Sequence, residues 1–115
     1  MAIVVMNQDH KLFPEQESLL NKNFGECEFL YVPSDGWTEQ EIRDHVRESV
    51  LARTQISVVV VSPIPLFLGL MAKSGVQTFI FHNDVRVKKE VSTPDGGKKL
   101  ISSVSPTGWK LIELR

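Results

Sequence analysis

The sequence has few of the residues that cross-link or anchor a chain. Cysteine occurs once, at Cys27, so no internal disulfide can form, which agrees with a reducing compartment. No apolar stretch approaches the roughly 20 residues that a membrane span requires. Residues 1–13 contain an apolar run of five residues without a basic leader or a small-residue cleavage site. We therefore expect a cytoplasmic chain with no signal peptide and no membrane contact.

Motifs for metals and for the common nucleotide folds are also missing. His10, His45 and His82 are not closely paired, and one cysteine cannot complete a zinc set, so we predict no metal and no cofactor. No G-x-G-x-x-G or Walker sequence occurs, which argues against the usual dinucleotide and nucleoside-triphosphate folds. The 115 residues suit one domain, and no low-complexity tract indicates disorder.

Charge is nearly balanced overall, at −1, but it is unevenly distributed. Residues 1–84 have six Lys or Arg against eleven Asp or Glu, whereas residues 85–115 have seven against three. The overall balance argues against a binder of long nucleic acid, while the local basic surface suits a small anionic ligand. A solvated basic hairpin explains the same pattern, and both interpretations stay open.

Strands and helices alternate along residues 1–84, which predicts an α/β fold. Apolar β-branched runs place strands at residues 2–6, 27–32, 56–61 and 76–81, and apolar spacing with capping residues places helices at residues 14–24, 38–53 and 66–72. Helices between consecutive strands require parallel pairing through right-handed crossovers. We therefore predict a Rossmann-like open parallel sheet, strand order 2-1-3-4, with flanking helices.

The C-terminal third has a different pattern. Three β-rich stretches, at residues 85–92, 98–105 and 109–114, are separated by turn signals and predict an antiparallel β-meander. The chain would then be one Rossmann-like domain, with a parallel core at residues 1–84 and a basic meander at residues 85–115.

The helix at residues 66–72 is apolar around its axis and must be covered on a second face. We expect either the meander or another subunit to cover it. A homodimer is therefore predicted.

Polar loops follow each predicted strand of the core. In open α/β sheets, ligands lie beyond the carboxyl ends of parallel strands, where the strand order reverses. The candidate ligand-binding residues at these ends, with two cations from the next strand, are Asn7, Gln8, Ser34, Ser62, Asn83, Arg86 and Lys88. Strand alternation places Arg86 and Lys88 on one face, where they can meet phosphates.

Three of the loop residues have more specific candidate roles. Ser62 precedes a helix, so it either caps that helix or contacts a ligand. His10 and His82 lie in strand-end loops, where a general acid or base is geometrically possible, so they are the candidate catalytic residues.

The order of elements, with two short motifs, resembles a known family. HKLFPEQ at residues 10–16 and VVVVSPIPLF at residues 58–67 resemble the small Rossmann-like proteins of type III CRISPR systems, which include ring nucleases. The resemblance implies a homodimer, acting in antiviral defence, that binds cyclic oligoadenylate and cleaves it without a metal. In such cleavage a ribose 2′-hydroxyl attacks the adjoining phosphate, and the protein orients the ring and stabilises charge.

The resemblance also implies residue roles. Asn7, Ser34 and Ser62 would contact the ligand, His10 or His82 would transfer the proton, and Arg86 and Lys88 would neutralise phosphate charge. The alternative is a non-catalytic dimer that binds a nucleotide or docks on a partner protein. Sequence alone leaves both readings open, because fold does not determine function.

Overall fold

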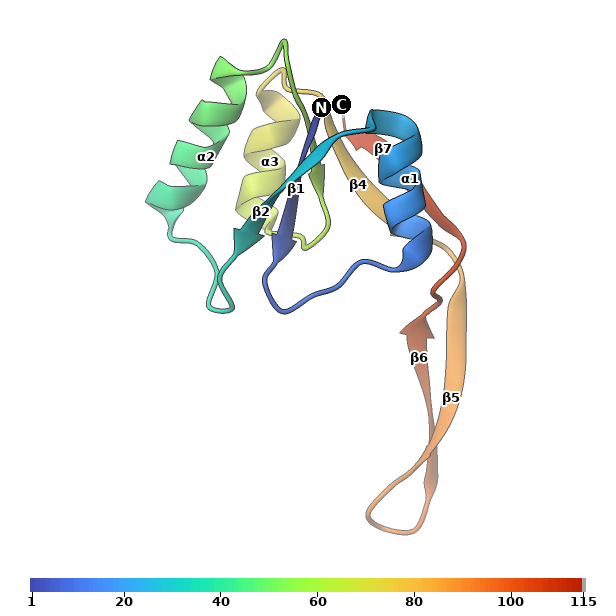
Figure 1. Cartoon of the computed structure of the whole chain (residues 1–115). Helices are drawn as coiled ribbons and strands as arrows, with labels where there is room; N and C mark the ends of the chain where they lie inside the picture. The colour runs from blue at the N-terminus through green and yellow to red at the C-terminus, as the bar shows by residue number, and fades with distance from the viewer. Residues whose placement is uncertain (115) are drawn as a thin grey trace.

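The computed structural model of the chain describes residues 1–114, which form an α/β fold. A five-stranded mixed sheet is flanked by three helices, and a two-stranded sheet projects from it (Figure 1). In chain order the elements are β1 (Ala2–Asn7), α1 (Pro14–Phe24), β2 (Cys27–Val32), α2 (Glu39–Leu51), β3 (Ser57–Val60), α3 (Pro65–Lys73), β4 (Thr78–Asn83), β5 (Arg86–Ser92), β6 (Lys98–Val104) and β7 (Trp109–Leu114).

The large sheet has the order β2-β1-β3-β4-β7. The first four strands are parallel, in the predicted order 2-1-3-4, and β7 is antiparallel to β4. β1 and β3 lie inside the sheet, and their apolar runs are buried, as expected for strands covered on both faces. The carboxyl ends of the four parallel strands therefore share one edge, from which the candidate loops emerge.

The two faces of this sheet are covered unequally. α2 and α3 lie on one face, over a core that includes Val5, Val58 and Phe67, whereas α1 alone lies on the other (Figure 1). Right-handed crossovers require this distribution, because the chain moves one way from β1 to β2 and the opposite way from β2 to β4. On the α1 face Phe29 and Tyr31 of β2 stay exposed.

Capping interactions fix where α1 and α2 begin. The side chain of Gln16, which is buried, accepts the Phe13 N–H at 2.9 Å. Thr38 Oγ1 accepts the Glu41 N–H at 3.2 Å while Glu41 Oε1 accepts the Thr38 N–H at 3.0 Å, and the two residues form a capping box at the start of α2. The Thr38 N–H lowers the pKa of the Glu41 carboxyl by stabilising its charged form.

The predicted C-terminal meander is wrong in its last strand. β5 and β6 pair antiparallel, as expected, but β7 leaves them and pairs with β4 in the large sheet. The reason is burial: Trp109 of β7 stacks on Phe13 at 5.9 Å between ring centroids and meets Phe81 edge-on at 6.1 Å. Beside β6 that indole would lie in water.

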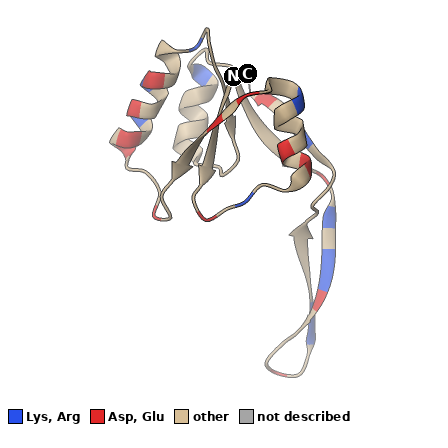
Figure 2. Cartoon of the chain, viewed as in Figure 1, with Lys and Arg blue, Asp and Glu red and all other residues tan. Residues whose placement is uncertain are grey.

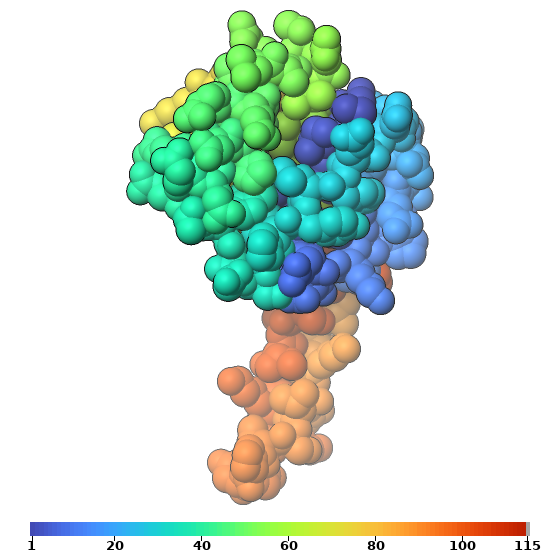
Figure 3. Space-filling model, turned by 60° about the vertical axis from the view of Figure 1, so that its left-hand side comes forward, coloured from blue at the N-terminus to red at the C-terminus, as the bar shows by residue number. Residues whose placement is uncertain are grey.

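β5, β6 and their turn form a ribbon that projects from the body of the molecule, and we call residues 86–104 the arm (Figure 3). Thirteen of the fourteen strand residues are exposed, the exception being half-buried Ser103. A hydrogen bond from the Thr93 N–H to the Gly97 carbonyl, 2.9 Å, closes the turn, and Gly96 has a φ of +85° that glycine adopts without strain. The arm has no core of its own.

The structure also identifies what covers α3. α2 packs against it, and Phe67 and Met71 of α3 are 1% and 0% exposed. α2, and not the meander, therefore supplies the second apolar surface for α3. Leu66 stays 41% exposed, and a second subunit on α3 stays a prediction. None of the described helices has the length and apolarity that a membrane crossing needs.

Candidate functional site

The loops that follow β1 and β3 are tied together by Ser62. Its hydroxyl accepts the backbone N–H of Asn7 at 2.9 Å, and it lies 2.7 Å from Nδ1 of His10. Ser62 is 8% exposed, whereas His10 is exposed, so this contact is partly buried. Three residues predicted separately for the site are therefore in one hydrogen-bonded group.

The same group extends to the loop after β2. Gln8 Nε2 donates to Ser34 Oγ at 2.9 Å, and Ser34 Oγ donates to the Asp9 carboxylate at 2.5 Å. The Asp9 N–H in turn donates to Asn7 Oδ1 at 2.9 Å. We call the whole set the strand-end network: Asn7, Gln8, Asp9, His10, Ser34 and Ser62. It confirms that the loops after three neighbouring strands converge, and it adds Asp9.

The Ser62–His10 contact limits what the network can do chemically. Ser62 Oγ already accepts from Asn7, so its own proton can go to Nδ1 of His10, and a neutral imidazole then has its proton on Nε2. A Ser–His contact of this length is the first requirement of a nucleophile and its base. Among residues 1–114, however, no carboxylate bonds His10 to complete a triad. The pair therefore holds two loops together and leaves Nε2 of His10 for proton transfer.

The capping alternative for Ser62 is wrong. α3 begins at Pro65 with Ile64 at the N-cap position, and no side chain caps it. Ser62 lies too far before the helix because two prolines, Pro63 and Pro65, extend the connection. Its hydroxyl instead bonds the loop after β1.

His82 belongs to a second polar group. Its Nε2 lies 2.6 Å from Oδ1 of Asp84, whose other oxygen accepts from Lys110 Nζ at 3.2 Å. The hydrogen bonds from His82 and then from Lys110 lower the pKa of the Asp84 carboxyl. No hydrogen bond among the described residues joins this group to His10, so the structure does not place the two candidate histidines in one site.

Asn83 has a structural role in place of the predicted ligand contact. It is 3% exposed, and its Nδ2 donates to the carbonyls of Ser105 at 3.1 Å and Thr107 at 2.8 Å. Its Oδ1 accepts the Val85 N–H at 2.8 Å. With every polar atom of the amide engaged, Asn83 fastens both ends of the arm.

Arg86 and Lys88 do share a face, but among residues 1–114 no hydrogen bond joins either of them to the strand-end network. Arg86 folds back, and its guanidinium donates to the carbonyls of Asn83 and Val85 at the base of the arm. Lys88 pairs with Ser102 farther along the arm, which points away from the body (Figure 1). That both cations meet a ligand beside the strand ends therefore stays a prediction, and the contacts of Arg86 are with the backbone at the base of the arm.

A pocket opens beside the strand-end network. It lies on the same face of the sheet as α1, over the part of that face that α1 does not cover. Its volume is about 600 Å³, within the usual range for small ligands. We call it the β1–α1 pocket, and its lining residues are Met6, Gln8, His10, Lys11, Leu12, Glu17, Phe29 and Tyr31.

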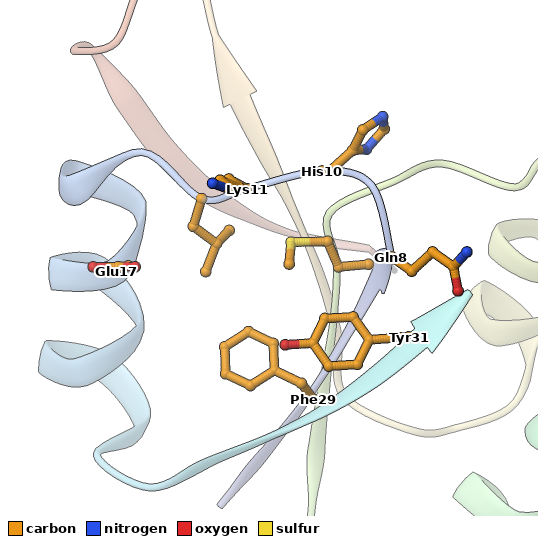
Figure 4. A pocket seen from close by; sticks show the side chains of 8 residues that line it. Gln8, His10, Lys11, Glu17, Phe29 and Tyr31 are labelled. Atoms are coloured by element: carbon orange, nitrogen blue, oxygen red, sulfur yellow. The ribbon is translucent and has the colours of Figure 1, made fainter. Parts of the chain in front are cut away.

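Two aromatic rings form the floor of the β1–α1 pocket. Phe29 and Tyr31 are stacked with centroids 5.8 Å apart and planes inclined by 13°, and they are 43% and 53% exposed. Lys11 lies on the loop above them, and the His10 ring points away from both (Figure 4). The pocket thus combines a flat aromatic surface with one cation and, across from it on α1, the carboxylate of Glu17.

Comparison of the chain with protein-family models, curated proteins and solved structures found no match. Function must therefore be argued from this geometry. Within residues 1–114, no three His, Cys, Asp or Glu side chains are grouped as metal ligands would be.

Sequence reasoning missed the three residues that give the pocket its character. Phe29 and Tyr31 fit the predicted strand at residues 27–32, and Lys11 follows the predicted strand at residues 2–6, so neither pattern by itself indicates a ligand site. The spacing of Phe29 and Tyr31 is the signal that could have identified the aromatic pair, since residues two apart on a strand lie on one face. Cys27 continues that face toward α1, and partial burial raises the pKa of its thiol, which fits a small apolar role better than a reactive one.

Proposed function

We propose that the chain binds a small anionic nucleotide in the β1–α1 pocket. The observation that supports this is the exposed, nearly parallel pair Phe29 and Tyr31 beside Lys11. Nucleobases stack on exposed aromatic side chains, with a gain of about 1–3 kcal/mol for each base, and any base can do so because each has a flat π-face. A neighbouring ammonium group then attracts the phosphate.

The polar rim suits the remaining parts of a nucleotide. Lys11 is a point charge for phosphate, and Glu17 is an acceptor for ribose hydroxyls or for the amino group of a base. The Gln8 amide, held by Ser34, offers a further donor at the strand ends. One cation and one carboxylate favour a ligand of few phosphates over a long polyanion.

The resemblance to the Rossmann-like proteins of type III CRISPR systems supplies the ligand class. Cyclic oligoadenylate has an adenine for the aromatic pair and a phosphate for Lys11 in each unit. Cleavage of such a ring by its own 2′-hydroxyl needs no metal. His10 is the candidate for the proton transfer, because Nδ1 is held by Ser62 and Nε2 is left over. Since its ring points away from Phe29 and Tyr31 (Figure 4), it would act on a unit of the ligand other than the stacked one. Binding is the function proposed, and cleavage is its extension.

Calorimetric titration tests the proposal with AMP, linear diadenylate, and cyclic tetra- and hexa-adenylate as probes. Wild-type protein should bind at least one probe. Tyr31→Ala should weaken binding by about tenfold or more, since a stacking contact is lost, whereas Tyr31→Phe keeps the ring and should bind as wild type does. Chromatography of the same mixtures detects cleavage, which His10→Ala should abolish without loss of affinity.

Two results would contradict the proposal. One is that no probe binds, and the other is that Tyr31→Ala binds as tightly as Tyr31→Phe.

A second candidate function is a protein-interaction module without turnover. The arm favours it, because apolar side chains are exposed along its length and at its base. Six of them are at least 37% exposed: Val85, Val87, Val91, Leu100, Ile101 and Val104. Such a surface is unusual on a chain that acts alone. The two functions are compatible, since the pocket and the arm are different parts of the molecule.

A further inference from the structure

The arm lacks the cover that such a ribbon normally has. A two-stranded hairpin is at best marginally stable in water, and it usually gains stability from a third strand or a packed layer. No helix or strand of the body lies over β5 or β6, and the fastening at Asn83 acts only on the base. An apolar, extended ribbon of this kind is typical of a segment that packs on another molecule.

The pairing register shows that the two faces of the arm differ. One face has Arg86, Lys88 and Glu90 on β5, opposite Val104, Ser102 and Leu100 on β6. On this face Glu90 forms an ion pair with Lys98 at 3.5 Å, and Arg86 bonds backbone carbonyls.

The other face has three aliphatic side chains, Val87, Val91 and Ile101, with Lys89 opposite Ile101 and Lys99 opposite Val91. We call it the Lys89 face. Among the described residues neither Lys89 nor Lys99 has an ion-pair partner. A surface that complements this face must be apolar and must supply carboxylates.

The body has such a surface on the opposite edge of the large sheet. A groove of about 430 Å³ runs between β2 and α2, and we call it the β2–α2 groove. Ile3, Leu30 and Ile56 line it with apolar side chains, Glu28 and Glu48 supply two carboxylates, and no Lys or Arg lines it. His45 also lines it, 3.9 Å from Glu48.

We propose that the Lys89 face of one copy docks in the β2–α2 groove of a second copy, and that the contact is repeated by two-fold symmetry. The charges decide the occupant. The arm has five Lys or Arg against two Asp or Glu (Figure 2). The acidic side chains that line the groove are Glu28 and Glu48, and no Lys or Arg side chain lines it. Arm-to-arm pairing would instead bring like charges together.

A chain cannot make this contact with itself. The arm leaves the body from β4 and β7, at the sheet edge opposite β2, and extends away from it (Figure 1). A two-fold axis lets each copy supply one arm and one groove, so a single association buries both arms and closes the assembly. The aromatic pair of the β1–α1 pocket lies on the other face of the sheet, although Phe29 lines the groove as well as the pocket.

Charge reversal tests the contact directly. The arm variant is Lys89→Glu with Lys99→Glu, and the groove variant is Glu28→Lys with Glu48→Lys. Each alone places like charges in both contacts, so its dissociation constant should rise by about tenfold or more. Mixed one to one, the two variants should form a heterodimer, because both contacts then pair opposite charges again.

The matched control changes the other face of the arm. Lys88→Glu with Lys98→Glu makes the same change in charge on the same strands but leaves the Lys89 face intact, so this variant should dimerise as wild type does. Sedimentation velocity gives the mass of each species, and circular dichroism checks folding. The salt dependence of the wild-type dimer is a further test that needs no substitution. Its dissociation constant should increase as salt rises from about 0.05 to 0.5 M.

Several outcomes would overturn the proposal. A wild-type chain that is monomeric at concentrations on the order of 100 μM has no such dimer. A dimer that both charge-reversed variants retain lies elsewhere, for example on α3. Failure of the folded variants to combine when mixed would exclude the pairing of arm with groove, and open-ended oligomers of the wild type would exclude the two-fold closure.

Discussion

The body and the arm both contain paired β-strands, but these strands are stabilised in opposite ways. In the body, the strands β1 and β3 are covered on both faces, and Val4, Val58 and Val59 are fully buried. In the arm the strands are as long or longer, yet none of their residues is buried. Backbone pairing alone therefore defines the shape of the arm, whereas side-chain burial defines the body, and the two should respond differently to the same substitution.

Truncation of one apolar side chain in each region should show the largest difference. Phe67→Ala removes a ring that is 1% exposed and lies edge-on to Trp37 at 5.6 Å, and it should lower the free energy of unfolding by about 3–5 kcal/mol. Leu100→Ala, at a side chain that is 67% exposed, should change it by less than about 0.5 kcal/mol. Urea unfolding of dilute protein measures both.

If Leu100→Ala lowered the free energy of unfolding as much as Phe67→Ala does, the contrast between body and arm would be wrong. It would mean that the arm is packed even in the dilute chain.

Loosening of the arm at its base should have a smaller effect. Asn83→Ala removes hydrogen bonds to Ser105, Thr107 and Val85 at a buried position and should cost about 1–3 kcal/mol. Because the loss is local, trypsin should cleave after Lys88 and the other lysines of the arm faster than in wild type. Asn83→Asp keeps the acceptor for Val85 and should be intermediate.

The opposite pattern, global destabilisation with no faster cleavage in the arm, would show that Asn83 supports the body.

Acid should have the smallest effect, through Asp84 at the junction of body and arm. Hydrogen bonds from His82 and Lys110 lower the pKa of this carboxyl in the folded chain, so the folded state binds its proton less readily than the unfolded state does. Its contribution is therefore present above the ordinary aspartate pKa and is lost as the pH falls below about 4.

The measurement is the difference in melting temperature between wild type and Asp84→Asn. This difference should be largest near neutral pH and should shrink toward about pH 3. A constant difference across that range would mean that the charge of Asp84 has no role.

Local patterns predicted the body well because burial on both faces dictates residue type directly. The valine run of β3 can be satisfied only inside a sheet, and the Thr38–Glu41 pair marks a helix start by its own hydrogen bonds. The place of β7 could not be read in this way. Its anchors are distant in sequence, as in the hydrogen bond from the Trp109 N–H to Glu15 at 2.6 Å, and strand periodicity does not identify a partner.

The candidate site was predicted by position but not by chemistry. The loops holding Asn7, Ser34 and Ser62 converge as expected, because parallel strands end at one edge of the sheet. The aromatic pair at Phe29 and Tyr31 was missed because an aromatic strand looks the same in sequence whether or not a helix covers it. The exposure of this pair depends on how many helices cover each face of the sheet, and α1 alone lies on the face of Phe29 and Tyr31.

The pairing of β4 with β7 makes the arm a self-contained insertion. Asn83 and Trp109 face each other directly, so the chain leaves the sheet and returns to it at neighbouring positions. An excursion whose two ends already meet can be shortened, lengthened or exchanged with little effect on the entropy of closing the chain. The contacts that the arm makes can therefore change while the pocket stays as it is, and each can be engineered or selected separately from the other.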